Sequence, residues 1–403
     1  MNTTGQPGFE QCAERADIQA EAHARPPLAV EFESAEVWNW VLYDLPDDPA
    51  AWQTPYDPAC RHKVLELAGG QLRIERHTEF VSVTWLGNGP PDAESLRVIG
   101  KCPGRQLAGA RVLVRPAGWE GVADVFGPGR IFGGMARFTG VEVATDFQIG
   151  ADQMVTYTLS GNFEDAFARG RLVKRLVDLE TYRMAALLGL PVVRQSTPAL
   201  QSLEVRTGVA MRALSTSEDE ALAASIREIS ALLAEVGALR EGLRYRIAAS
   251  KAYYDIVSDR LASLAEAPIG QRQTLKGFVD HRLAPAIKTV GAFDRRISDV
   301  SATLSDAMAL ARTRLEQTSQ EYNQALLVSM EKRARQQVHL GQAVEGLSVA
   351  AISYYVVGLI GVLIKSLPHF AVSVPVLQAI SVPAVIALVW WNVRRAKARV
   401  EKV

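Results

Sequence analysis

Two apolar runs near the C-terminal end, residues 347–364 and 370–391, constrain this chain more than any other feature. Neither run contains an Asp, Glu, Lys or Arg. An α-helix needs about 20 mostly apolar residues to cross the hydrocarbon layer of a membrane. The alternative, two buried helices of a soluble core, is disfavoured because soluble helices usually expose a charged face. The sequence therefore predicts two transmembrane helices, joined by residues 365–369 into a hairpin.

Basic residues gather on the outer flanks of the two runs. Cytoplasmic flanks of membrane helices carry an excess of Lys and Arg, so both chain ends are expected in the cytoplasm. Residues 1–20 are polar and lack the apolar core of a secretory signal, and the three cysteines show no metal-type spacing. We therefore expect a multi-pass protein of a bacterial inner membrane. The flanking basic residues are Lys332, Arg333 and Arg335 before the runs, and Arg394, Arg395, Lys397 and Arg399 after them.

The charge balance argues against one class of partner. The 403 residues include 44 Lys and Arg and 44 Asp and Glu, so the net charge is zero. No overall positive field attracts nucleic acid, and no basic and aromatic interleaving is present. Phosphate loops, nucleophile elbows and paired cysteine motifs are also missing from the sequence. We expect no nucleic-acid partner, no cofactor and no enzymatic activity of a familiar class.

The N-terminal part reads as a mixed α and β domain. Residues 1–20 are expected to be disordered, residues 21–162 to form an α/β domain, and residues 163–190 to form a helix packed on it. A mostly antiparallel sheet is expected, because no long helices alternate with the strands. Short segments of alternating or β-branched residues predict strands at 71–75, 79–85, 111–115, 141–147 and 154–159.

The middle of the chain carries a heptad pattern. Ser217 and Glu220 form a capping box, and apolar residues then recur every three or four positions over 222–264 and again over 275–304. A turn at 268–270 separates the two ladders, which predicts an antiparallel coiled-coil hairpin whose tip projects into the cytosol. The predicted hairpin and stalk span 216–346, the two membrane helices lie within 347–391, and 392–403 form a basic cytoplasmic tail. The expected fold class is thus an α+β domain, a long coiled-coil hairpin and a transmembrane hairpin.

Several phrases spread over the chain resemble a known family. The chain is similar to domain-of-unknown-function family 3422, a group of uncharacterised, membrane-anchored bacterial proteins. The resemblance implies a bacterial membrane protein and carries no activity and no catalytic residue. The phrases are Glu-Ala-His-Ala-Arg-Pro at 21–26, Glu-Arg-His-Thr-Glu-Phe at 75–80, Asp-Leu-Glu-Thr-Tyr-Arg-Met at 178–184, Val-Glu-Gly-Leu-Ser at 344–348 and Ile-Ser-Tyr-Tyr at 352–355.

The expected layout also resembles the CorA group of divalent-cation channels. That likeness concerns the order of parts: a small head, a long helical hairpin, a stalk entering the first membrane helix, and a basic tail. It implies an oligomer whose pore is lined by the first membrane helix. The Gly-Met-Asn signature of that group is missing, since residues 358–364 read Gly-Leu-Ile-Gly-Val-Leu-Ile.

His77 and Glu79 are the main candidates for chemistry in the N-terminal domain. They are two residues apart on a predicted strand and so share a face. With His23 or Glu21 they could hold a metal ion or an anion. The alternative is a hydrogen-bonded charged network that closes the domain, and it is favoured because two ligands do not make a site.

Two further pairs of opposite charge lie one helical turn apart. They are Glu180 with Arg183, and Arg175 with Asp178. A pair at this spacing contributes only about 0.2–0.5 kcal/mol, so its expected role is to orient the helix on the sheet.

Small residues form a stripe along the first predicted membrane helix. Small side chains let helices approach closely, so the stripe predicts packing against the second helix or another subunit. The alternative is a pore lining of Ser348, Ser353 and Tyr355, with Glu345 at the cytoplasmic mouth. The stripe consists of Gly346, Ala350, Ser353 or Tyr354, Val357 and Gly361.

These observations lead to two hypotheses about function. The first is a non-enzymatic oligomeric scaffold or sensor, with a cytosolic head, the lipid bilayer and a possible cytosolic protein as its partners. The second is a CorA-like cation channel or transporter that lacks the Gly-Met-Asn filter.

Overall fold

The computed structural model describes residues 12–16, 18–19, 26–137, 139–216, 219–366 and 374–400. The chain divides into two compact units. Unit 1 comprises Met1–Ser217 and Ala223–Met308, and unit 2 comprises Glu218–Leu222 and Ala309–Val403. Glu21, His23 and most of the N-terminal segment that was expected to be disordered lie outside the described residues.

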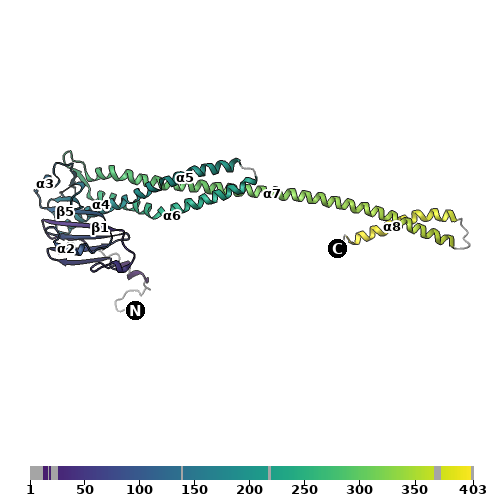
Figure 1. The fold of residues 1–403 in the computed structure, drawn as a ribbon, viewed down its shortest axis with the longest axis horizontal. Coiled ribbons are helices and arrows are strands. Elements are labelled where there is room, and N and C mark those ends of the chain that lie inside the picture. The colour runs from purple at the N-terminus through teal and green to yellow at the C-terminus, as the bar shows by residue number, and fades with distance from the viewer. Residues whose placement is uncertain are drawn as a thin grey trace, which may run out of the picture. The chain divides into compact units, whose positions relative to one another are not determined.

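Unit 1 is built on a mixed sheet, which has nine strands among the described residues (Figure 1). The strand order is β2-β3-β4-β1-β5-β8-β7-β6-β9; β5 and β8 pair in parallel, and the other neighbours are antiparallel. The strands are β1 (Ala35–Tyr43), β2 (His62–Leu67), β3 (Gly70–Arg76), β4 (Phe80–Gly87), β5 (Arg105–Arg115), β6 (Phe132–Ala136), β7 (Val141–Ile149), β8 (Val155–Ser160) and β9 (Glu266–Pro268).

Both faces of this sheet bury apolar side chains, because successive residues of a strand point to opposite sides. On one face, Val37 of β1 belongs to a core with Leu176 and Val279, which come from two of the long helices. On the other face, Val83 and Trp85 of β4 form a second core with Ile99 of the short helix α2 (Ala93–Ile99). The sheet is therefore a central layer, with helices over one face and α2 with loops over the other.

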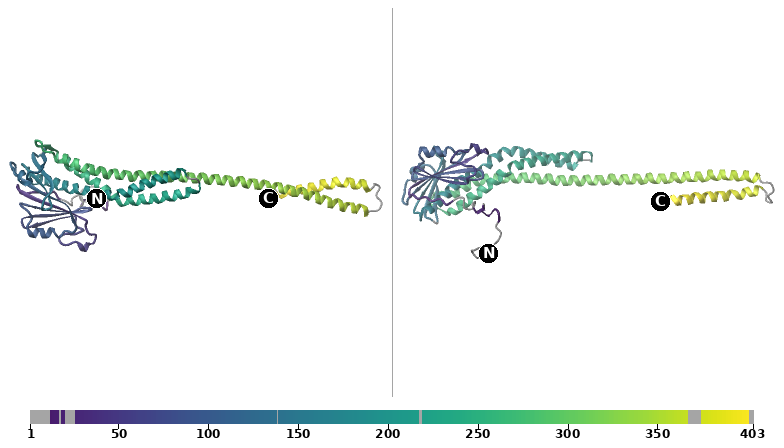
Figure 2. Two further views of the ribbon diagram at one scale, coloured as in Figure 1. Left: turned by 45° about the horizontal axis from the view of Figure 1, so that its top comes forward. Right: turned by 90° about the horizontal axis from the view of Figure 1, so that it is seen from below.

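Six further helices follow α2 in the described chain. Three of them, α5, α6 and the first part of α7, run side by side in the views of Figure 2. The apolar ladders over 222–264 and 275–304 supply buried residues to this arrangement, among them Ile229, Val236, Val257, Val290 and Ile297. The helices are α3 (Val122–Phe126), α4 (Ala166–Leu187), α5 (Gly189–Thr216), α6 (Asp219–Leu264), α7 (Leu275–Ser366) and α8 (Val374–Val400).

The connection between α6 and α7 differs from the expected free tip. Residues Glu266–Pro268 form β9, which pairs with β6 at the edge of the sheet. Gly134 permits this pairing, because a Cβ there would lie 2.2 Å from the carbonyl oxygen of Ala267. The carboxylate of Glu266 also accepts a hydrogen bond of 3.0 Å from the amide of Leu275 and so caps α7. The turn between the two ladders is therefore not a free hairpin tip but part of the sheet.

Helix α5 was missed in the sequence. Gly189 and Pro191 suggest a break after α4, yet α5 begins at Gly189 and runs to Thr216. Pro191 is tolerated because it lies in the first turn, where an amide has no partner within the helix. Pro198 lies inside the helix, which continues past it.

The predicted transmembrane hairpin is contradicted. Within the described ranges, one helix, α7, is long and apolar enough to cross a membrane, judged by length and composition. The second run does not meet this criterion in its described part: α8 (Val374–Val400) contains Pro383 and continues into the basic end of the chain, and residues 370–373 lie outside the described residues. The CorA-like layout and the multi-pass topology depended on two such helices, so neither is supported.

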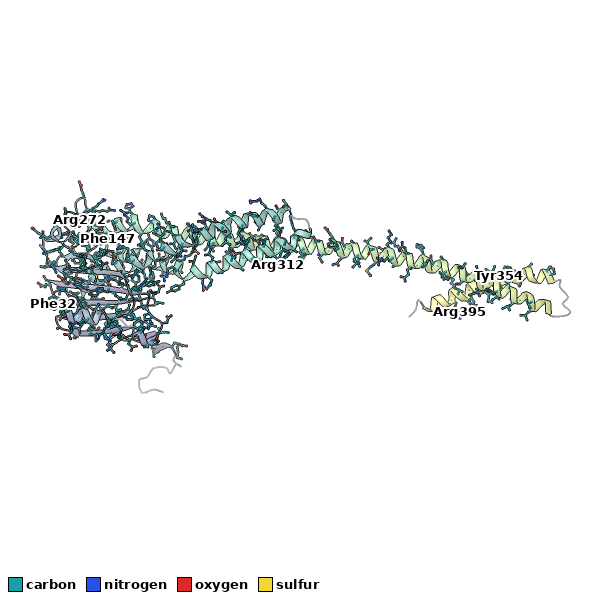
Figure 3. The ribbon with its side chains drawn as sticks, in the orientation of Figure 1. Phe32, Phe147, Arg272, Arg312, Tyr354 and Arg395 are labelled. Atoms are coloured by element: carbon teal, nitrogen blue, oxygen red, sulfur yellow. The ribbon has the colours of Figure 1, made fainter. Side chains whose placement is uncertain are left out.

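Unit 2 contains the last part of α7 together with α8. Side chains such as Tyr354 on α7 and Arg395 on α8 stand out from their helices in Figure 3. Large apolar side chains are exposed along this part of α7, including Tyr322, Leu326, Met330 and Leu359. In contrast to the first part of α7, this stretch leaves its apolar surface largely uncovered by unit 2 itself.

Candidate functional site

The segment His77–Thr78–Glu79 forms the turn between β3 and β4. Its geometry is set by the hairpin, since the amide of His77 donates a 2.8 Å hydrogen bond to the carbonyl oxygen of Phe80. His77 and Glu79 were expected to share one face of a strand. The structure instead places them in this turn, where their side chains have different neighbours.

The two side chains take part in separate interactions. The Nε2 atom of His77 lies 4.0 Å from a carboxylate oxygen of Glu75, and its ring stacks on Phe80 with 4.4 Å between the ring centroids. Glu79 pairs with Arg246 of α6, whose Nη1 lies 2.9 Å from Oε2. The described part of the chain contains no cluster of three His, Cys, Asp or Glu residues that could hold a metal. Because His23 lies outside that part, the metal hypothesis stays a prediction.

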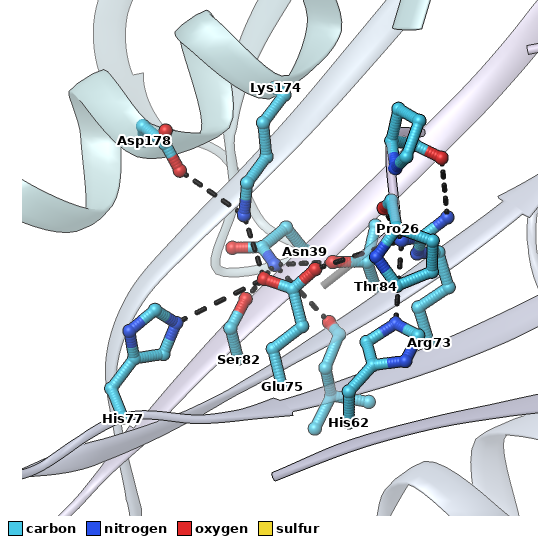
Figure 4. Close-up of polar contacts among 12 residues, drawn as sticks. Pro26, Asn39, His62, Arg73, Glu75, His77, Ser82, Thr84, Lys174 and Asp178 are labelled. Atoms are coloured by element: carbon cyan, nitrogen blue, oxygen red, sulfur yellow. Dashed lines mark hydrogen bonds and ion pairs between the residues drawn. The ribbon is translucent and has the colours of Figure 1, made fainter. Parts of the chain in front are cut away.

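A row of charged side chains lies beneath α4, as Figure 4 shows. Glu75 projects from β3 toward the helices and is 2.8 Å from the Nζ atom of Lys174. Lys174 also lies 3.3 Å from Asp178, which in turn accepts a 2.9 Å hydrogen bond from Arg260 of α6. These ion pairs join the sheet, α4 and α6 through one continuous polar network.

Neutral polar residues continue this layer across the same face of the sheet. Asn39 of β1 is buried and donates hydrogen bonds to the hydroxyl groups of Ser82, at 2.7 Å, and Thr84, at 2.9 Å, both on β4. Arg73 of β3 donates a 2.6 Å hydrogen bond to the carbonyl oxygen of Pro26 (Figure 4). The N-terminal segment is thereby attached to the polar part of the sheet.

The charged row shifts the pKa values of Glu75 and Lys174 toward their ionised forms. Burial acts to raise the pKa of Glu75, but Lys174, His77 and Arg73 together outweigh it and hold the pKa below its ordinary value. Burial likewise acts to lower the pKa of Lys174, and the carboxylates of Asp178 and Glu75 outweigh it and raise the pKa. The pair is therefore charged in the folded protein.

Acid is expected to destabilise the wild-type protein more steeply than a Glu75→Gln variant. A carboxyl group whose pKa is lowered by folding contributes stability above its unfolded pKa of about 4.5, and this contribution is lost as the pH falls through the folded pKa. Glutamine does not titrate and so lacks that contribution. Urea midpoints of the full chain in detergent, followed by tryptophan fluorescence between about pH 6 and pH 3, measure the difference. Parallel pH profiles would contradict the role assigned to Glu75.

A cavity of about 590 Å³ opens on one side of the turn. Arg61, Arg76 and His77 line it from the sheet side, and Tyr182 of α4 and Tyr253 of α6 line it from the helices. The two tyrosine rings lie 5.6 Å apart between centroids, and Phe80 contacts both of them edge-on. We call this space the basic pocket.

A second cavity, of about 310 Å³, lies on the other side of the same turn. It shares Arg76 and Thr78 with the basic pocket and is lined also by Glu79, Tyr245 and Arg246. The guanidinium of Arg246 lies between the rings of Tyr43 and Tyr245, at 5.9 and 5.7 Å from their centroids. Burial and the nearby Glu79 raise the pKa of Tyr245 to about 12, so its hydroxyl group stays protonated. We call this space the acidic pocket.

The helical charge pairs are partly rearranged. Arg183 pairs with Glu180 at 2.6 Å, and the hydroxyl of buried Tyr157 donates a 2.9 Å hydrogen bond to the same carboxylate. Asp178, in contrast, pairs with Lys174 and Arg260 rather than with Arg175. These contacts hold α4 to the sheet and to α6.

The candidate residues of the apolar end of α7 lie in unit 2. Ser348 donates a 2.8 Å hydrogen bond to the carbonyl oxygen of Val344 in its own helix. Ser353 is buried within unit 2, whereas Tyr355 is exposed and its ring contacts that of Tyr354. The predicted roles of Glu345, Gly346, Ala350 and Gly361 in packing or in a pore stay predictions.

Sequence reasoning singled out His77 and Glu79 but placed them on a strand, and it missed the helical residues that face them. Tyr253 and Arg246 lie on α6, about 170 positions after His77 and Glu79 in the chain, and only the fold brings them together. The available signal was that the polar residues Arg240 and Ser250 interrupt the apolar ladder of α6 on either side of Arg246, although Ser250 is itself buried.

Comparison with known proteins gives one informative match. A family model described as "Protein of unknown function (DUF3422)" matches residues 10–400. No curated protein matches the chain. Among solved structures, the chain is similar to BrvH, a flavin-dependent halogenase from Brevundimonas sp. BAL3, with 12% identity and a TM-score of 0.18 over 70% of this chain. The chain spans about half (53%) of that protein, and a likeness this low carries no argument.

Proposed function

Since the chain belongs to DUF3422, a family of proteins of unknown function, we propose its role from its structure: a membrane-anchored, non-enzymatic, oligomeric scaffold or sensor with a cytoplasmic head. The head is unit 1, and the anchor is the apolar end of α7. No catalytic constellation is assigned to the head in this proposal.

The continuity of α7 is the observation that carries the proposal. The helix begins with Leu275, Val279 and Leu283 inside the core on the helix-covered face of the sheet, and the same helix continues to Ser366. Its apolar stretch passes the length and composition criteria for a membrane span, and few residues of that stretch are buried. An unbroken helix transmits a displacement along its axis, which is what a sensor requires.

The charges that flank the apolar stretch support a cytoplasmic head. Lys332, Arg333 and Arg335 precede the stretch on the side of unit 1, and the positive-inside tendency assigns that side to the cytoplasm. A bacterial inner membrane is the compartment that fits this orientation.

Two arginines at the centre of the apolar stretch are expected to release the protein from the membrane. The variant is Tyr355→Arg with Leu359→Arg, two exposed positions one turn apart. Arginine is among the costliest side chains to place at the centre of a membrane helix. Carbonate-washed membranes are separated from soluble protein by ultracentrifugation, and the variant is expected in the supernatant while the wild-type chain stays in the pellet.

The matched control is Leu326→Arg with Met330→Arg. These positions have the same spacing on the same helix and are also exposed, but they precede the apolar stretch. This control is expected to remain in the pellet. If the central double variant also remains there, the assignment of α7 as the anchor is wrong.

Exposed apolar side chains on α7 support the oligomeric part of the proposal. Tyr322, Leu326, Leu327, Met330 and Leu340 are all exposed in unit 2. A helix in water is stabilised mainly by packing of its apolar face, so a second copy of the chain is the simplest partner for this surface. A monomeric mass for the detergent-solubilised chain, measured by light scattering, would remove the oligomeric part.

A further inference from the structure

Arg175 of α4 lacks the partner that the sequence suggested for it. Asp178, which lies three residues later, pairs instead with Lys174 at 3.3 Å and with Arg260 of α6 at 2.9 Å. Arg171 lies one helical turn before Arg175, so the two arginines share a face of α4. Within the part of the chain that the structure describes, neither arginine side chain takes part in a hydrogen bond or an ion pair. Two adjacent cations are thus left without a counter-charge.

The surroundings of Arg175 make this arrangement unfavourable. Burial lowers the pKa of Arg175, and the positive charges of Arg171 and Arg260 lower it further. Both effects disfavour the charged form of the side chain. Like charges one turn apart on a helix also repel each other. A negative group that enters from outside the protein offsets these effects, because it attracts both arginines.

A cavity of about 200 Å³ lies beside the two arginines. Thr139 lines it from the turn between β6 and β7, Asn162 from the segment before α4, and Ser263 from the last turn of α6. All of these segments belong to unit 1. We call this space the arginine cavity.

The lining of the arginine cavity offers hydrogen-bond donors together with positive charge. Arg171 and Arg175 supply guanidinium N–H groups, and Asn162 supplies a side-chain amide. Among the described lining residues, Glu164 is the one acid, and it is exposed. Positive groups around a concave surface concentrate anions there.

We propose that the arginine cavity binds a phosphate group through the guanidinium groups of Arg171 and Arg175 and the side-chain amide of Asn162. The paired N–H donors of arginine match two oxygens of a phosphate group. The bound phosphate supplies the missing counter-charge. Phe163 and Leu172 give the cavity an apolar wall, which accommodates a short carbon chain attached to the phosphate. The site lies in the head and goes beyond the proposed membrane role, on which it does not depend.

The size of the arginine cavity limits the ligand. Sites for drug-sized ligands enclose about 300–1,000 Å³. The arginine cavity, at about 200 Å³, is smaller. A phosphate ion or a phosphate monoester with a short carbon chain fits this space, whereas a nucleotide extends beyond it. Inorganic phosphate and glycerol 3-phosphate represent these two sources of the phosphate group, so the test includes both.

Isothermal titration of the full detergent-solubilised chain at low ionic strength tests the proposal with inorganic phosphate, glycerol 3-phosphate and glycerol. Both phosphate compounds are expected to bind, and glycerol is not. Arg175→Ala is expected to weaken binding of phosphate about tenfold or more, because it removes hydrogen bonds between two charged groups. Arg171→Ala is expected to have a similar effect at an exposed position of the same helix.

Arg212→Ala is the matched control for the loss of charge. Arg212 is an exposed arginine of α5, belongs to unit 1 and does not line the arginine cavity. This variant removes one positive charge from the head and is expected to bind phosphate as the wild type does. The control therefore separates binding at the site from general attraction of anions to the protein.

Glu164→Gln is expected to have the opposite effect. Glutamine is similar in size to glutamate but carries no charge, so the substitution removes the one acid among the described lining residues. Because the carboxylate repels an anion, the variant is expected to bind phosphate about threefold more tightly. Unfolding cannot produce tighter binding, so this measurement tests the site even if Arg175→Ala does not fold.

Three results would overturn the site. The first is failure of both phosphate compounds to bind. The second is equal binding of phosphate by Arg175→Ala and Arg212→Ala, since the attraction would then be general. The third is binding of glycerol as tight as that of glycerol 3-phosphate. None of these results changes the sedimentation of the chain with carbonate-washed membranes, so the site and the anchor can fail separately.

Discussion

Replacing Lys174 with alanine is expected to lower the free energy of unfolding by about 3 kcal/mol, because the change leaves the Glu75 carboxylate buried without its closest cation. Lys174 lies 2.8 Å from Glu75, whereas Arg73 and His77 are both at 4.0 Å. Removing one partner of a buried ion pair costs about 3–5 kcal/mol. The lower end applies here, since Arg73 and His77 remain and the Lys174 side chain is 37% exposed.

The double variant Glu75→Gln with Lys174→Met separates charge from packing. It removes both charges and keeps side chains of similar length, so it is expected to recover most of the stability lost by Lys174→Ala. Urea unfolding of the full chain at neutral pH measures all three proteins. If the double variant is as unstable as the single one, the loss comes from packing around α4 rather than from an unpaired carboxylate.

The strands and long helices could be predicted because their signals are local. The expected strands at 71–75, 111–115 and 154–159 coincide with β3, β5 and β8, and the ladders over 222–264 and 275–304 fall within α6 and α7. In each case the spacing of apolar residues alone determines the element. Gly189 and Pro191 suggested the end of a helix, whereas α5 begins at Gly189. Whether proline ends a helix depends on its position, since it is tolerated in the first turn and disruptive in the interior.

The placement of these elements could not be predicted from local signals. The three residues Glu266–Pro268 carry no strand pattern, yet they pair with β6 because the sheet edge and the helix ends meet there. The second apolar run suggested a membrane helix from its composition, whereas α8 extends beyond that run into the basic end of the chain. Such outcomes depend on contacts between residues far apart in the chain.

The candidate site shows the same division between local and distant information. His77 and Glu79 stood out in the sequence as chemically unusual neighbours. His77 pairs with Glu75 of β3, which in turn pairs with Lys174 of α4, whereas Glu79 pairs with Arg246 of α6. These partners lie on three different elements. The sequence could suggest a charged network closing the domain, but not the two cavities beside the turn, since a cavity is defined by what surrounds it.

Shortening Leu283 to alanine is expected to lower the free energy of unfolding of the head by about 2–5 kcal/mol, because the change leaves a cavity where α7 packs on the core. Leu283 is 2% exposed and belongs to the core on the helix-covered face of the sheet. If α7 is anchored in the head in this way, the head and the first part of the helix unfold together. Denaturation of the full chain, followed by near-ultraviolet circular dichroism, measures the loss.

Leu315→Ala provides the matched control for this loss. It is the same substitution on the same helix at a position that is 51% exposed, so it is expected to change the free energy of unfolding by no more than about 0.5 kcal/mol. A large effect at Leu315 would mean that this side chain is covered by another copy of the chain, which a concentration-dependent midpoint would reveal. A small effect at Leu283 would mean instead that α7 is not fixed to the sheet. The proposed sensor role would then lose its support, because a helix that is not packed firmly on the core of the head cannot transmit a displacement of the head toward the membrane.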